Sequence, residues 1–252
     1  LAIGYNALGG AIAGGETNIA IGNYTLDALT SGDRNIALGY IAMSGMQSGG
    51  YNIAIGYGAL DVEDEGWDNV AMGLHALGGA SMSGSYRNTG IGNYTLDALT
   101  SGNDNTAVGT YGLSAVNTGY GNVGMGYYAG YSTTTGYNNT LIGKYAIASA
   151  NSGYNQTVIG YDAVGQANNS VVLGDGNVTA VYMADDKGAT VYASSVATGG
   201  GSAAGVYKSD GNYDVTLKTG NSTTGSITIT DGSNGDITIA PNGTGETDFD
   251  DN

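Results

Sequence analysis

The apolar positions of this chain recur in a five-residue cassette that reads Asn, an apolar residue or Thr, a small residue, an aliphatic residue and Gly. The closing glycines Gly22, Gly39, Gly56 and Gly73 follow one another at intervals of 17 residues. Eight complete copies occupy 18–22, 35–39, 52–56, 69–73, 88–92, 105–109, 122–126 and 139–143. A unit this short cannot bury its own apolar face, so neighbouring units must stack. The repeat therefore predicts a β-solenoid of about ten coils, most of them 17 residues long.

A second apolar segment follows each cassette after one or two residues. It pairs a small residue with an aliphatic one, as at Thr25 and Leu26 or at Ala42 and Met43. We expect two short strands per coil, with the small and the aliphatic side chains on opposite faces, because side chains alternate along a strand. The Gly between the two segments suits a tight corner. Helices are excluded because each of the 47 glycines would cost about 1 kcal/mol relative to Ala inside one.

Both faces of the predicted strands are apolar, one lined by Ala, Gly and Thr and the other by Ile, Leu, Val and Met. One face is enough to fill a narrow coil. The other predicts a homo-oligomer, since a long aliphatic stripe left in water is an association site. The chain opens at Leu1 inside a repeat, so we expect a processed end or the start of a fragment. The unpaired strand edge there would be covered by head-to-tail stacking of a second subunit.

The cassette also carries a family resemblance. Its form Asn-Ile-Ala-Ile-Gly, starting at Asn18, Asn35 and Asn52, resembles the head repeats of trimeric autotransporter adhesins and the similar repeats of bacteriophage tail fibres. The resemblance covers 1–174 and implies a left-handed parallel β-roll assembled as a homotrimer. The coil here is longer than the usual adhesin head repeat, which predicts an extended loop on one side.

The chain changes character after Gly174, where the cassette disappears. Short alternating segments follow, such as 213–219, 226–230 and 236–240, with Asp-Gly and Asn-Gly turn signals between them. A run of three glycines at 199–201 marks a boundary or hinge. The sequence thus predicts an all-β protein with a β-roll repeat domain at 1–174, a neck or connector at 175–199 and a β-rich stem or junction module at 200–252.

The charge balance limits the kinds of partner. The chain has 22 acidic and six basic residues, for a formal net charge of −16. This excess argues against nucleic acid and against an anionic bilayer as partners. No apolar stretch approaches the roughly 20 residues that span a membrane. The absence of Cys removes disulfides and thiolate metal sites.

The Asn that opens each cassette predicts a structural ladder. Equivalent amides on stacked coils can hydrogen-bond to one another along the solenoid, as amide ladders do in stacked β-structures. Recognition at the surface is the alternative role. The residues concerned are Asn18, Asn35, Asn52, Asn69, Asn88, Asn105, Asn122 and Asn139.

The densest acidic segment lies in the turn around Trp67. It contains Asp61, Glu63, Asp64, Glu65 and Asp68. Carboxylate oxygens could hold Ca²⁺, for which we name Asp61, Glu63, Asp64 and Asp68, although the spacing is not that of an EF-hand. A carboxylate pair could also cleave glycosides. We favour a solvated loop, and expect no cofactor unless Ca²⁺ binds here.

Aromatic residues supply the remaining candidate site. Tyrosines recur next to the cassette and would form rows along the stacked coils. Packing at coil corners is the structural interpretation, and a ligand-binding surface that includes Tyr40, Tyr57 and Trp67 is the functional one. The single His, His75, is interpreted as a surface residue, so nucleophilic catalysis has no base and no catalytic residue is predicted.

Together these features predict a non-enzymatic structural fibre protein. We expect an elongated homo-oligomer, either an extracellular filament subunit or a tail-fibre shaft, that serves attachment at the cell surface or virion surface. The alternative is a receptor- or glycan-binding adhesin module, and a polysaccharide-degrading tail spike is less favoured. The expected partners are further copies, as a homotrimer or a head-to-tail polymer, and a glycan or protein of a host surface. Membrane insertion is not expected.

Overall fold

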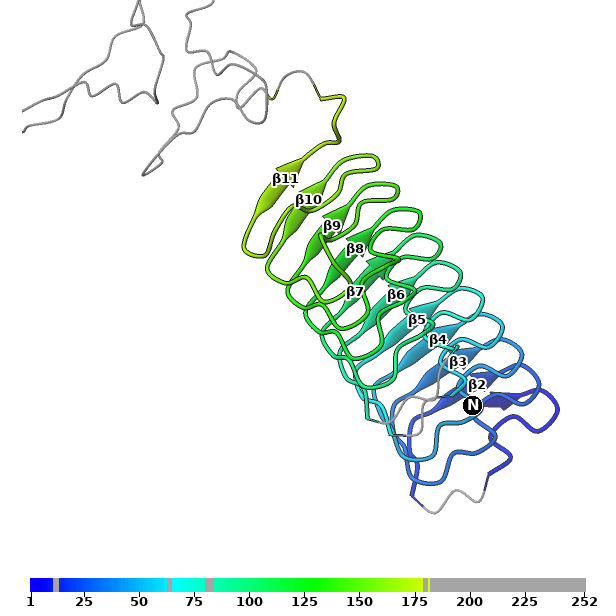
Figure 1. Cartoon of the computed structure of the whole chain (residues 1–252). Helices are drawn as coiled ribbons and strands as arrows, with labels where there is room; N and C mark the ends of the chain where they lie inside the picture. Colours follow the sequence, from blue (N-terminus) through cyan, green and yellow to red (C-terminus); the bar gives the residue numbers. More distant parts are fainter. Residues whose placement is uncertain (11–13, 63–64, 80–83, 179–180, 182–252) are drawn as a thin grey trace, which may run out of the picture. The chain divides into compact units, whose positions relative to one another are not determined.

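The computed structural model describes residues 1–10, 14–62, 65–79, 84–178 and 181. In this part the chain forms one parallel sheet of eleven strands, ordered as they occur in the sequence, and no helix (Figure 1). The strands are β1 (Ala2–Ile3), β2 (Ile19–Ile21), β3 (Ile36–Leu38), β4 (Ile53–Ile55), β5 (Val70–Met72), β6 (Thr89–Ile91), β7 (Thr106–Val108), β8 (Val123–Met125), β9 (Thr140–Ile142), β10 (Thr157–Ile159) and β11 (Val171–Leu173). The predicted parallel β-solenoid of about ten coils, most of them about 17 residues long, is confirmed.

Each strand consists of the three central residues of a cassette. Neighbouring strands pair in register, so that Ile19 lies beside Ile36, Ala20 beside Ala37 and Ile21 beside Leu38. The middle residue of β2 to β10 is buried, whereas the two flanking residues point outward and are only partly covered. The small middle residues therefore fit the narrow interior, as alternation within a three-residue strand requires.

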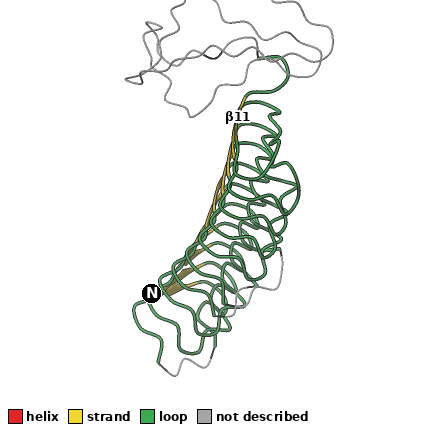
Figure 2. Ribbon diagram, turned by 60° about the vertical axis from the view of Figure 1, so that its left-hand side comes forward, coloured by secondary structure: helices red, strands yellow, loops and turns green. Residues whose placement is uncertain are grey.

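The second apolar segment of the coil is a turn, and the prediction of a second strand there is wrong. Figure 2 shows strands along one side of the solenoid only, with loops on the others. Tyr24 and Leu26 have φ angles of 57° and 52°, in the left-handed region, with Thr25 between them. Side chains do not alternate in such a turn, and Thr25 and Leu26 are both fully buried. The prediction that they lie on opposite faces is therefore also wrong.

The side-chain type at the Leu26 position decides whether the turn persists. The equivalent residues in the next four coils, Met43, Leu60, Leu77 and Leu96, also have φ near 52°. Ile147 and Val164 occupy this position in later coils, where φ is not positive and the two residues form a parallel bridge. A β-branched side chain disfavours the left-handed region, so these coils adopt an extended backbone instead.

The core is thin and made of aliphatic and small side chains. Its largest fully buried members include Leu26, Leu29, Met43, Met46 and Leu60. Burying one such side chain stabilises the fold by roughly 1.5–3 kcal/mol, which offsets the cost of about 1–2 kcal/mol for a left-handed residue. The turn is therefore tolerated because it turns Leu26 and its equivalents inward.

The Gly that closes each cassette is required by two features of the backbone. Gly56 has a φ of 141°, a region that residues with a side chain rarely adopt. A Cβ on Gly56 would also lie 2.3 Å from the carbonyl oxygen of Gly73 in the next coil. The same pair of constraints recurs at Gly39, whose Cβ would lie 2.3 Å from the oxygen of Gly56.

The predicted neck at 175–199 and stem at 200–252 fall almost wholly outside the described residues. Of these segments only 175–178 and 181 are described, and 176–177 form a turn after β11. The boundaries given for the neck and the stem therefore stay predictions.

Candidate functional site

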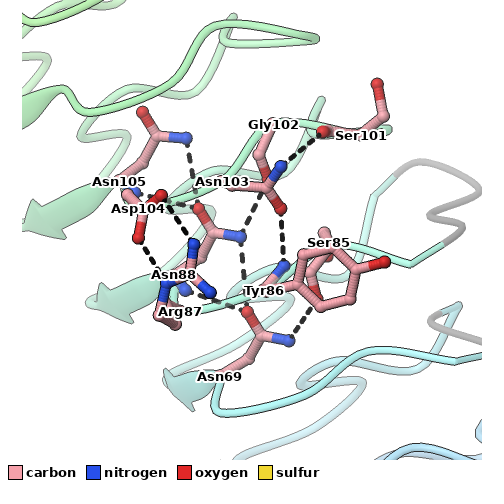
Figure 3. A network of polar contacts seen from close by, with 10 residues as sticks. All are labelled: Asn69, Ser85, Tyr86, Arg87, Asn88, Ser101, Gly102, Asn103, Asp104 and Asn105. Atoms are coloured by element: carbon pink, nitrogen blue, oxygen red, sulfur yellow. Dashed lines mark hydrogen bonds and ion pairs between the residues drawn. The ribbon is translucent and has the colours of Figure 1, made fainter.

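The cassette asparagines form a buried ladder along the coils. The side-chain amide of Asn105 donates to Oδ1 of Asn88 at 3.1 Å and to the carbonyl oxygen of Gly119 at 2.9 Å, and its backbone N–H donates to the same Oδ1 at 3.0 Å (Figure 3). Asn122 makes the same donations to Asn105 and to Gly136. Backbone donation to the preceding Oδ1 links the whole series Asn18, Asn35, Asn52, Asn69, Asn88, Asn105, Asn122 and Asn139.

The ladder leaves no room for a ligand. Seven of these asparagines are completely buried and Asn18 is 7% exposed. Their donors and acceptors are engaged with the backbone and with one another, which is what buried polar groups require. At the next coil Gln156 replaces Asn, and its side chain turns to Ser149 and Asn168 instead. The geometry of these amides is that of structural residues.

Aromatic rings form a row at the corner after the cassette. Consecutive ring centroids lie 4.6–6.0 Å apart along the series Tyr5, Tyr24, Tyr40, Tyr57, His75, Tyr94, Tyr111, Tyr128 and Tyr145. Tyr40 and Tyr57 are about half exposed and stack on each other with centroids 5.4 Å apart. Trp67 belongs to a different row, where it packs on Tyr51 at 6.1 Å. Two of the three predicted ligand residues are therefore direct neighbours, and the third contacts another tyrosine.

His75 is a member of the aromatic row and has acidic neighbours. Its ring lies 5.3 Å from that of Tyr57 and 5.9 Å from that of Tyr94. Burial raises the pKa of Asp61 and of Asp97, and the nearby His75 opposes this by lowering the pKa of both. The Oδ1 atom of each aspartate is buried and has no hydrogen-bond partner. The position of His75, where most other coils carry Tyr, was the sequence signal for its place in the row.

The acidic segment is only partly described. Asp61 is half-buried, whereas Glu65 and Asp68 are exposed, and 63–64 lie outside the described residues. Among the residues that are described, no group of three His, Cys, Asp or Glu side chains is placed to hold a metal ion. Site geometry for Ca²⁺ through Glu63 and Asp64 stays a prediction.

A hollow opens beside the aromatic row and was not predicted from the sequence. It measures about 450 Å³ and is lined by Tyr24, Asp27, Tyr40, Ile41, Ser44, Gly45 and Asp61. These residues come from three consecutive coils, within 34 residues of their cassette glycines Gly22 to Gly56. Its polar lining groups are hydroxyls and carboxylates.

The outward side of the sheet, which we call the outer sheet face, is an apolar surface. It is formed by the first and third residues of strands β2 to β11, which are aliphatic, Met or Thr. Met72, Ile91, Met125 and Ile159 are 37–42% exposed on it, and Val171 is 68% exposed. A contiguous apolar surface of this kind marks an interaction site more often than a free surface.

Comparison with protein-family models, with curated proteins and with solved structures gives no significant match. Over the described ranges, no helix has the length and apolar character needed to cross a membrane. The functional argument therefore rests on the chain's own geometry.

Proposed function

We propose that this chain is a non-enzymatic structural subunit of a fibre and that it self-associates through the outer sheet face. The observation that carries the proposal is the partial exposure of aliphatic and Met side chains along that face. The face repeats from β2 to β11 because each coil adds one strand in register. Burying apolar surface contributes roughly 25 cal/mol per Å², so a face that grows with each coil favours association in proportion to its length.

The resemblance of the cassette to adhesin heads and tail-fibre repeats supports a homotrimer as the assembly. A cyclic arrangement would place the outer sheet faces of all copies against one another, which buries each of them equally. We propose an extracellular, cell-surface or virion-surface location for such a fibre, with attachment as its role. A head-to-tail polymer is the further assembly that the stacked coils would permit.

The test is the oligomeric state of the full chain, measured by sedimentation and by light scattering coupled to size exclusion. We expect a trimer for the wild type and a monomer for Met72→Glu combined with Ile91→Glu, because two carboxylates per subunit would be desolvated at the interface. Gln47→Glu combined with Asn117→Glu adds the same charge at exposed positions off the face and should stay trimeric. Circular dichroism checks that all variants keep the β-fold. A wild type that is monomeric at micromolar concentration would overturn the proposal.

A second candidate function is recognition of a receptor or glycan by the aromatic rows. The observation that favours it is the exposure of Tyr40, Tyr57 and Trp67, which are 45%, 49% and 38% exposed. Rings with one free side can stack on the apolar face of a sugar or on a protein side chain. Loss of cell or glycan attachment in Tyr40→Ala, Tyr57→Ala and Trp67→Ala variants that remain oligomeric would support this function, and unchanged attachment would remove it.

A further inference from the structure

The hollow beside the aromatic row exists because one coil carries small residues between two coils that carry acids. Asp27 and Asp61 stand at the same place in their coils, five residues after the cassette Gly. Ser44 stands at that place in the coil between them, followed by Gly45. The smaller side chains leave a volume of about 450 Å³ with an aspartate on either side.

The hollow carries negative charge that no basic side chain compensates. Asp27 accepts one hydrogen bond, from the neutral side-chain amide of Asn6 at 3.3 Å, and Oδ1 of Asp61 is buried without a partner. The basic residues of the described ranges are engaged elsewhere. Arg34 donates to the Tyr51 hydroxyl, Arg87 pairs with Asp104, and Lys144 lies over tyrosine rings. Two carboxylates in a partly dehydrated site favour a cation over a neutral or anionic ligand.

Two tyrosine rings form a corner on the wall of the hollow. The ring centroids of Tyr24 and Tyr40 are 6.0 Å apart and their planes meet at 81°, while the side chains are 36% and 45% exposed. Ring faces attract ammonium groups within about 6 Å of the centroid. The same chain uses this contact elsewhere, with Arg34 5.2 Å from the centre of the Tyr51 ring and Lys144 5.3 Å from that of Tyr145.

We infer that the hollow binds an organic ammonium group, with its charge between Asp27 and Asp61 and its alkyl carbons against the rings of Tyr24 and Tyr40. A volume of about 450 Å³ admits an alkylammonium or a quaternary ammonium of a few carbons. Ser44 offers a hydroxyl that can accept or donate at the floor of the site. This binding belongs to the flank of a single chain and does not depend on the proposed self-association.

The test is titration of the full chain with choline, followed by calorimetry and by NMR of the tyrosine ring protons. The matched control ligand is 3,3-dimethylbutanol, which has the shape of choline without its charge. We expect choline to bind with a dissociation constant on the order of 1 mM and the neutral alcohol to bind at least about tenfold more weakly. Butylammonium as a third ligand distinguishes a site for primary amines from one for quaternary groups.

Variants assign the binding to this hollow. We expect Asp27→Asn and Asp61→Asn each to weaken choline binding about fivefold or more, and Tyr40→Leu to weaken it about threefold. Asp97→Asn is the matched control, because 91–102 repeats 21–32 residue for residue and Asp97 does not line the hollow. Equal binding of choline and the neutral alcohol would overturn the inference. So would an equal loss in Asp97→Asn and Asp27→Asn, or no binding at about 20 mM choline. Oligomeric state measured on the same samples separates this outcome from failure of the proposed fibre assembly.

Discussion

Oδ1 of Asn88 accepts two hydrogen bonds from Asn105, one from the backbone N–H at 3.0 Å and one from the side-chain amide at 3.1 Å. This relationship between residues 17 apart joins two coils through a buried side chain and not only through the strand backbone. Because Oδ1 of Asn105 serves Asn122 in the same way, each amide supports two neighbours.

Replacement of one ladder amide should therefore be costly. In Asn105→Ala the carbonyl of Gly119 loses a donor and the N–H of Asn122 loses an acceptor, both in a buried environment. We expect a loss of roughly 2 to 4 kcal/mol in the free energy of unfolding, measured by denaturant titration. The exposed amide Gln47 provides the control, and Gln47→Ala should change stability by less than about 0.5 kcal/mol. Equal effects of the two changes would show that the ladder does not stabilise the coils.

The cassette Gly should not tolerate a side chain. In Gly56→Ala the new Cβ would collide with the Gly73 carbonyl, and the φ of 141° would be strained as well. We expect a loss of about 3 kcal/mol or more, or a failure to fold, as judged by thermal unfolding followed by circular dichroism. Gly176→Ala is the matched control, because nothing lies within 4 Å of the added Cβ. A Gly56→Ala protein as stable as the Gly176→Ala protein would contradict the stacking geometry.

The turn conformation after the cassette can be tested with two substitutions that preserve side-chain volume. Leu96 has a φ of 52°, and Met43 occupies the equivalent position with a φ of 51°. We expect Leu96→Met to cost less than about 1 kcal/mol, since Met is an unbranched replacement of similar size. Leu96→Ile should cost about 2 kcal/mol more, because a β-branched residue disfavours a left-handed backbone. Denaturant titration of both proteins measures the difference, and equal stabilities would argue for an extended backbone at this position.

Acidification should relieve an electrostatic cost around His75. Burial raises the pKa of Asp61 and of Asp97 in the folded state, so folding disfavours their ionised forms. A carboxyl with a raised pKa binds more protons in the folded than in the unfolded chain, and its contribution to stability improves as pH falls through the folded pKa. Asp104 acts in the opposite sense, because its hydrogen bond from Arg87 lowers its pKa and that support is lost on acidification.

Variants separate these opposing contributions. Between about pH 7 and pH 5, we expect the unfolding midpoint of the wild type to gain on that of Asp61→Asn combined with Asp97→Asn, because Asn cannot take up a proton. The measurement is thermal unfolding at constant ionic strength over this range. Asp162→Asn, a change at an exposed aspartate, serves as the control. A difference between wild type and double variant that stays constant with pH would contradict the burial of Asp61 and Asp97.

The sequence by itself determined the stacking of the coils. A cassette that recurs every 17 residues places Ala20, Ala37 and Ala54 at equivalent points of successive coils, so the parallel order and register of β2, β3 and β4 follow from the spacing alone. The column of asparagines from Asn18 to Asn139 follows for the same reason. Periodicity specifies which residues become neighbours because each coil repeats the path of the one before it.

Tertiary structure decided the path within a coil. The pair Thr25 and Leu26 reads as a strand, because a small residue next to an aliphatic one does not reveal the sign of φ. The left-handed turn is stable only because the neighbouring coils bury Leu26, which offsets the local strain. The hollow at Asp27 and Asp61 likewise depends on how three consecutive coils meet, since its walls belong to residues 34 apart in sequence. Spacing determines which coils stack, whereas packing between coils selects the backbone conformation and the spaces left between side chains.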